Sequence, residues 1–322
     1  MSEPADFYAK RLVDATPPIP ESRGASGYFS RPASGLDPRL FNGHGQVYEL
    51  VRQQILGTLY RHWTPLYTGA QDWSTVWIAG SGASHQFAAD RGDGDLDILI
   101  GVDWERFFAD NPAFANLTPQ EAADLVNAEL KAHLWPKTSR TLISGYPFEM
   151  TFYINPLGEH IEDIGAYAAY NLTADRWDIE PPDLPQDPRT LFTDTDWQAA
   201  DEDRRTAAAL RDATDRALAA ARRSRPGTPA WADAISELRR TASRAAAFFD
   251  DIHLGRHAAF APGGRGFLDP ANFRWQSAKL SGVAQELAQI KRLDVELTAT
   301  QRPDTPHVDV LVYRALHHLD VS

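Results

Sequence analysis

The chain has 322 residues and a formal net charge of −12, because 44 Asp and Glu outnumber 32 Lys and Arg. The length allows about two domains at roughly 150 residues each, and the acidic balance argues against a general nucleic-acid binder. Without cysteine, the chain has no disulfide-linked partner and no thiolate chemistry. It contains no apolar run of about 18 residues and no apolar signal-peptide core near its start, so we expect a cytoplasmic protein with no membrane partner.

The first two-thirds of the chain mixes helical and strand patterns. Apolar residues between Val47 and Trp63 recur at three- and four-residue steps, which predicts an amphipathic helix over about 45–65. The runs at 75–79 and 95–102 are typical of strands, the second half-buried.

A second helix and a strand pair follow. Thr118 and Glu121 have the spacing of a capping box, which predicts a helix from there to about residue 134. The runs at 140–144 and 148–155 predict two further strands, joined by a turn at 145–147.

The composition changes after the Pro-rich stretch at 178–190, where the chain becomes rich in Ala and Arg. Helical periodicity then recurs near 199–224, 229–252, 271–292 and 307–318. We therefore expect an α+β protein in three parts: an N-terminal arm (1–43), a mixed-sheet domain (44–190) and a helical domain (191–322).

Two carboxylates stand out on the strand at 95–102. A strand has a two-residue period, so Asp95 and Asp97 point to one face and Leu96 to the other. Adjacent carboxylates repel each other unless a cation or a shared proton compensates. Their hard oxygen ligands suit Mg²⁺, which prefers carboxylate and phosphate oxygens.

Two further features fit a metal and phosphate site around Asp95 and Asp97. Gly80 and Ser81 directly follow the strand at 75–79, and a tight turn there presents N–H groups and a hydroxyl to a phosphate. Glu149 lies on the polar face of an alternating strand, where it could bind a metal or act as a general base.

The Gly80–Ser81 turn, thirteen intervening residues, the Asp95–Asp97 pair and the later acid Glu149 resemble the polymerase-beta-type nucleotidyltransferase superfamily. The resemblance implies a mixed sheet with flanking helices, followed by a helical domain. It implies that the aspartates bind two Mg²⁺ or Mn²⁺ ions, that Glu149 helps to activate the acceptor hydroxyl, and that the turn holds NTP. The intervening loop is at the long end for this family, and the third acid is Asp in many members.

The expected reaction moves a nucleoside monophosphate from NTP to an acceptor hydroxyl and releases pyrophosphate. An RNA end or a nucleotide is the favoured acceptor, with a small molecule or a protein as alternatives. Arg274 and Lys279 are predicted to reach the triphosphate from the helical domain. Two other classes stay open: a catalytically silent nucleotide-binding module of this fold, and an unrelated interaction protein with a chance acidic pair.

Two competing metal sites are less well supported. A calcium loop starting at Asp93 would need Gly and Glu where Ile98 and Trp104 stand. His253 and His257 have the i, i+4 spacing of a zinc site, but no acid lies between them to act as a base. We interpret them as ordinary surface or core histidines.

Overall fold

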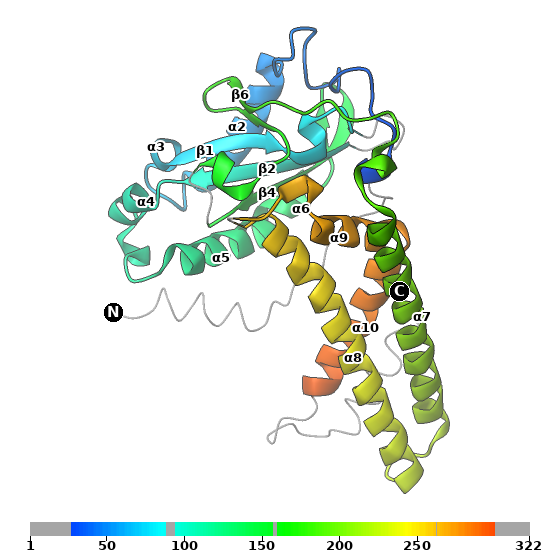
Figure 1. Ribbon diagram of the computed structural model, residues 1–322. Helices are drawn as coiled ribbons and strands as arrows, with labels where there is room; N and C mark the ends of the chain where they lie inside the picture. The colour runs from blue at the N-terminus through cyan, green and yellow to red at the C-terminus, as the bar shows by residue number, and fades with distance from the viewer. Residues whose placement is uncertain (1–26, 88–93, 157–159, 262, 300–322) are drawn as a thin grey trace. The chain divides into compact units, whose positions relative to one another are not determined.

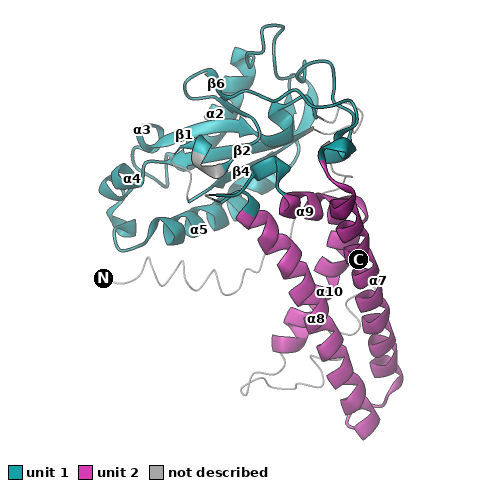
Figure 2. Cartoon of the chain, in the orientation of Figure 1, with its two compact units in different colours: residues 1–18, 26–191, 259–269 teal, residues 19–25, 192–258, 270–322 magenta. Residues whose placement is uncertain are grey.

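The computed structural model describes residues 27–87, 94–156, 160–261 and 263–299. The described residues form two compact units, one comprising 27–191 and 259–269, the other 192–258 and 270–299 (Figure 2). The first contains the sheet and the second is helical. Most of the expected arm and the whole expected helix at 307–318 lie outside the described residues.

A six-stranded mixed sheet forms the centre of the first unit (Figure 1). Its strand order is β3-β4-β2-β1-β5-β6. Neighbours β2 and β4 run parallel, and the other neighbouring pairs are antiparallel. The strands are β1 (Ser74–Ala79), β2 (Gly94–Val102), β3 (Thr141–Ile143), β4 (Tyr146–Ile154), β5 (Ala169–Asn171) and β6 (Arg176–Ile179). The expected α+β class and mixed sheet are therefore confirmed.

One face of this sheet is the main apolar core. Leu96, Ile98 and Ile100 of β2 are completely buried there, as the alternating pattern predicts. Helix α2 (Glu49–Trp63) contributes Ile55, Leu59 and Trp63 to the same cluster. The expected apolar stripe of this helix has one exception, because Leu50 is 78% exposed.

Helix α5 (Pro119–Glu129) begins with the expected capping box, in which Thr118 and Glu121 bond reciprocally. It continues as a π-helical turn (Leu130–Leu134) and a short helix α6 (Trp135–Thr138). Strand β4 pairs with β3 only near its start, so the rest of its outer edge needs other partners.

Two side chains from these helices supply those partners. The Asn127 amide donates to the Ile154 carbonyl at 2.8 Å and accepts from the Ile154 N–H at 2.7 Å. The Thr138 hydroxyl donates to the Met150 carbonyl at 2.8 Å. These bonds fix the helical segment along β4, beside the predicted third acid.

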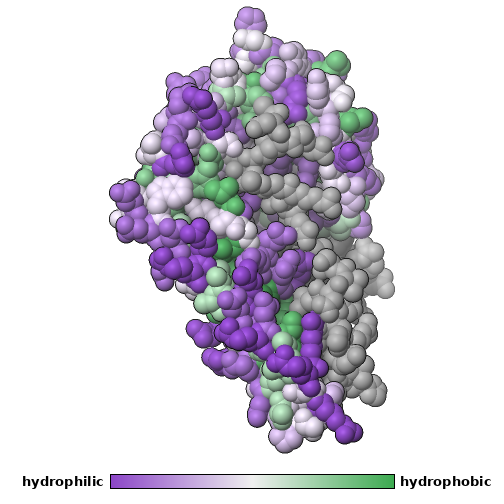
Figure 3. All heavy atoms as spheres, turned by 90° about the vertical axis from the view of Figure 1, so that its right-hand side faces the viewer, coloured by the Kyte–Doolittle hydropathy of each residue, from purple (hydrophilic) through white to green (hydrophobic). Residues whose placement is uncertain are grey.

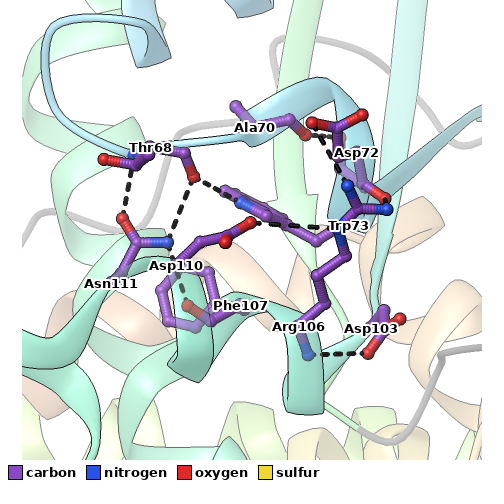
Figure 4. Close-up of polar contacts among 10 residues, drawn as sticks. Thr68, Ala70, Asp72, Trp73, Asp103, Arg106, Phe107, Asp110 and Asn111 are labelled. Atoms are coloured by element: carbon purple, nitrogen blue, oxygen red, sulfur yellow. Dashed lines mark hydrogen bonds and ion pairs between the residues drawn. The ribbon is translucent and has the colours of Figure 1, made fainter.

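A polar network holds α3 (Ala70–Trp73) beside α4 (Trp104–Asp110). The Asn111 side chain accepts from the Thr68 N–H at 2.9 Å and donates to the Thr68 and Phe107 carbonyls (Figure 4). The Trp73 indole also donates to the Thr68 carbonyl. Every one of these contacts involves a backbone group of Thr68 or Phe107, so we interpret the network as structural.

The second unit consists of four described helices, among which α7 and α8 are long neighbours (Figure 1). They are α7 (Asp194–Arg223), α8 (Pro229–Ala259), α9 (Pro270–Leu280) and α10 (Val283–Ala299). The single helix expected at 271–292 is wrong, because the chain breaks into α9 and α10 at Ser281 and Gly282. Gly282 adopts φ +81°, a left-handed conformation that ends a helix.

The turn between β3 and β4 also differs from the prediction. It consists of Ser144 and Gly145, both with positive φ, whereas Tyr146 and Pro147 already belong to β4. A two-residue turn of this kind matches the twist of an antiparallel hairpin. Strands β5 and β6 were not predicted, because three or four residues are too few to show a two-residue period.

The surface in Figure 3 is mainly hydrophilic, with small and scattered apolar areas. No helix within the described residues has both the length and the apolar character needed to cross a membrane.

Candidate functional site

The predicted acids lie on the face of the sheet opposite the main core. In the parallel pair of β2 and β4, Asp95 is the direct partner of Glu149, and Asp97 is the partner of Thr151. Neighbouring strands are about 4.8 Å apart, so the Asp95 and Glu149 side chains leave the sheet next to each other. Three carboxylates from two strands therefore share one face, although Glu149 is distant in sequence.

The Gly80–Ser81 turn lies against this face. Ala79, the last residue of β1, is the direct partner of Asp97, and a short 3₁₀ turn (Gly80–Ala83) follows at once. Gly80 adopts φ +69°, and a Cβ built on it would lie 3.0 Å from the Asp97 Oδ2. Glycine is therefore favoured at this position both for the backbone conformation and for the close approach to Asp97.

The second glycine of the turn brings the backbone onto the acid strand. A Cβ on Gly82 would lie 2.8 Å from the Leu96 Cδ2 and 3.1 Å from the Asp95 carbonyl oxygen. The Gly80 N–H donates to the Ala168 carbonyl at 3.3 Å, so this amide already has a partner within the fold. The predicted phosphate contact is therefore left to Ser81, whose side chain is exposed, and to the later amides of the turn.

Glu149 has a hydrogen-bond donor that the sequence analysis missed. The Trp135 indole N–H donates to the Glu149 Oε1 at 3.0 Å. The Glu149 side chain is half-buried on the polar face, with Phe148 and Met150 buried on the other. The sequence signal at Trp135 was an aromatic residue before a proline, which does not by itself indicate a site.

Two alanines lie beside Asp97 on this face, and they belong to a buried apolar cluster that also contains Trp77, Leu99 and Ile161. Ala79 lies beside Asp97 in the sheet, and Ala169 of β5 is the next partner in the same row. Asp95 is exposed and Asp97 is half-buried. The face therefore offers access to the carboxylates from solvent.

The donor set matches a hard divalent cation in kind, because all three acids offer carboxylate oxygens. In the described part of the chain, however, no three His, Asp or Glu side chains converge closely enough to hold a metal ion. Strand register brings the acids to one face, and a change of side-chain rotamers would be needed to bring their oxygens onto one ion.

Arg274 and Lys279 lie on α9 in the second unit. The Arg274 guanidinium donates to Asp203 of α7 and to Asp251 of α8, at 2.5 and 2.6 Å. The hydrogen bond that Arg274 donates to Asp203 is the main cause that raises the pKa of Arg274. Trp275 is only 9% exposed and belongs to the helical core. The predicted nucleotide contacts of Arg274 and Lys279 stay predictions.

The two histidines of α8 lie side by side, with ring centroids 4.6 Å apart. His253 also stacks on Phe249 and contacts Trp275. Burial is the main cause that lowers the pKa of His253 to about 4, with a smaller contribution from His257. Its packing against two rings agrees with the interpretation as an ordinary core histidine.

The segment 259–269 belongs to the first unit although it connects α8 to α9. Phe267 stacks on Tyr167 at 3.9 Å and contacts Tyr28 at 4.5 Å. A Cβ on Gly266 would lie only 2.3 Å from the Gly165 carbonyl oxygen, so the two backbones touch. These contacts anchor the glycine-rich segment to the first unit, which the sequence did not indicate.

Comparisons with family models, with curated proteins and with solved structures find no match to this chain.

Proposed function

We propose that this protein is a metal-dependent nucleotidyltransferase that moves a nucleoside monophosphate from an NTP to an acceptor hydroxyl. One observation carries the proposal: Asp95 lies directly opposite Glu149, while a glycine turn approaches Asp97 from the neighbouring strand. Like charges directly opposite each other in a sheet destabilise it, so this arrangement suits a site that takes a cation.

In the proposed reaction, Asp95, Asp97 and Glu149 would hold Mg²⁺ or Mn²⁺. When bound, the two ions supply positive charge against the triphosphate and favour ionisation of the acceptor hydroxyl. Ser81 and the amides after it contact the phosphates.

Glu149 accepts the proton of the acceptor hydroxyl. The acceptor oxygen then bonds to the α-phosphorus, the bond from that phosphorus to the bridging oxygen breaks, and pyrophosphate leaves. We favour an RNA end or a nucleotide as acceptor.

Label transfer tests the proposal. We would incubate the full chain with each α-labelled NTP, with Mg²⁺, Mn²⁺ or a chelator, and with or without a pool of small RNAs. We expect label in a new species only when metal is present, and its size separates an RNA acceptor from a small one.

NTP binding by calorimetry distinguishes the alternatives. An active enzyme binds NTP more tightly with Mg²⁺, whereas a silent module of this fold binds without transfer. If neither label transfer nor metal-dependent NTP binding were observed, the proposal would be overturned. That result would favour an interaction protein with a chance acidic pair.

A further inference from the structure

We infer that Trp135 is a positioning residue for Glu149, and the inference rests on the function proposed above. The geometry is direct, since the indole N–H donates to the Glu149 Oε1 at 3.0 Å. No other hydrogen bond to this carboxylate is found among the described residues. One oxygen of the third acid is thus held by the fold, and the other is available for a cation or a proton.

The chemistry of the donor suits this role. An indole N–H donates but carries no charge, unlike the guanidinium of Arg or the ammonium of Lys. It can therefore fix the carboxylate in one orientation without cancelling the negative charge that a cation would need. An Arg at this position would form an ion pair with Glu149 and compete with the metal.

The backbone around Trp135 is irregular, and the irregularity places the indole. The Trp135 N–H bonds to the Leu130 carbonyl, five residues back, which is the π-helical pattern. One extra residue in a turn rotates everything after it by about 100° around the helix axis. Pro136 contributes, because it has no N–H for a regular helical bond. Such π-helical turns occur frequently at functional sites.

The segment is also held firmly at both ends. Asn127 bonds to both backbone groups of Ile154, and Thr138 bonds to the Met150 carbonyl, the residue next to Glu149. The indole therefore approaches Glu149 from a helix that is fixed to the same strand. A donor held in this way restricts the rotamers of its acceptor.

The first test compares two matched Trp→Phe variants. Trp135→Phe removes the donor to Glu149, whereas Trp104→Phe removes an indole N–H that is buried without a hydrogen-bond partner. We expect Trp135→Phe to lower kcat for label transfer about 10- to 100-fold at unchanged KM for NTP. Trp104→Phe should leave both unchanged. Equal kcat in Trp135→Phe and wild type would overturn the inference.

The second test asks whether Trp135 acts through Glu149. In a Glu149→Ala background, Trp135→Phe should cause no further loss of activity, because the two side chains form one unit. Independent, multiplying losses would instead indicate a purely structural role for the indole.

The third test does not require activity. The nine tryptophans give nine indole N–H resonances, and the two Phe variants assign those of Trp135 and Trp104. Glu149→Ala should shift the Trp135 resonance and leave that of Trp104 in place. An unshifted Trp135 resonance would overturn the inference. An inactive wild type would count against the proposed function alone, and this resonance would still decide whether Trp135 orients Glu149.

Discussion

Two pairs of carboxylates, one pair in each unit, have different neighbours. In the helical unit, Asp203 faces Arg274 and Asp250 faces Lys291 on another helix. On the sheet of the first unit, Asp95 instead faces Glu149, which accepts a hydrogen bond from the uncharged indole of Trp135.

The two pairs use charge differently. Opposite charges on neighbouring helices attract each other, whereas adjacent acids repel each other and oppose folding. Features that break such local rules are expected at functional sites, where chemistry requires them. The following substitutions test whether the two units divide structural and catalytic charge in this way.

The largest expected effect follows from removing an acid. Asp97→Asn should lower transfer by about 10³-fold, because a metal-bound carboxylate contributes several kcal/mol to transition-state stabilisation. Asp124→Asn on the exposed face of α5 is the matched control and should be silent. Wild-type turnover in Asp97→Asn would contradict the proposed division between structural and catalytic charge, because the acid pair would then have no catalytic role.

A comparison of two Gly→Ala variants separates the effect of backbone strain on stability from the effect of site geometry on transfer. Gly80→Ala and Gly145→Ala both place a side chain at positive φ, which costs about 1–2 kcal/mol in stability. Only the Gly80 Cβ would press on Asp97, since nothing lies within 4 Å of a Cβ on Gly145. We expect similar losses in urea denaturation, but about 100-fold slower transfer in Gly80→Ala alone. Equal transfer rates would show that the turn does not position Asp97.

Removing an arginine from the ion pairs of the helical unit should lower the stability of the protein. Arg274→Gln should destabilise the protein by about 1–3 kcal/mol, because it removes bonds to two carboxylates and the site is half-buried. Arg240→Gln, which breaks an exposed pair with Glu237, should change stability much less, because solvent screens this pair. The KM for NTP should stay constant in Arg240→Gln. A raised KM for NTP in Arg274→Gln would support the predicted nucleotide contact of Arg274, and an unchanged KM would leave Arg274 with a role in stability alone.

The smallest effect concerns pH. Burial lowers the pKa of His253 to about 4, below the ordinary value of 6.5. Between these two values the unfolded chain binds a proton that the folded chain does not, so stability falls as pH falls. We expect a loss of about 1 kcal/mol from this group between pH 7 and 5, discounted for its half-exposed position. In thermal melts, the Tm of His253→Gln should fall less between pH 7 and 5 than the Tm of the wild type. An equal fall in Tm would show that other groups cause the pH dependence.

Much of the local structure could be predicted from the sequence. The period of two placed Leu96 and Asp95 on opposite faces of β2, and the Thr118 and Glu121 pair marked a helix start. The break at Gly282 was missed, because apolar periodicity continues across it while the backbone turns left-handed. Short elements such as β5 were missed because local patterns need more residues to show a period.

For the candidate site too, some features follow from the sequence and others only from the tertiary structure. By itself, the sequence determined which residues of β2 and β4 alternate, that a helix begins at Thr118, and that Asp95 and Asp97 share a face, since these depend on neighbours along the chain. Only the tertiary structure decided that Glu149 lies opposite Asp95, that Trp135 donates to it, and that Arg274 faces two carboxylates. These contacts join residues far apart in sequence, and their geometry depends on strand register, a π-helical turn and helix packing, which no local pattern encodes.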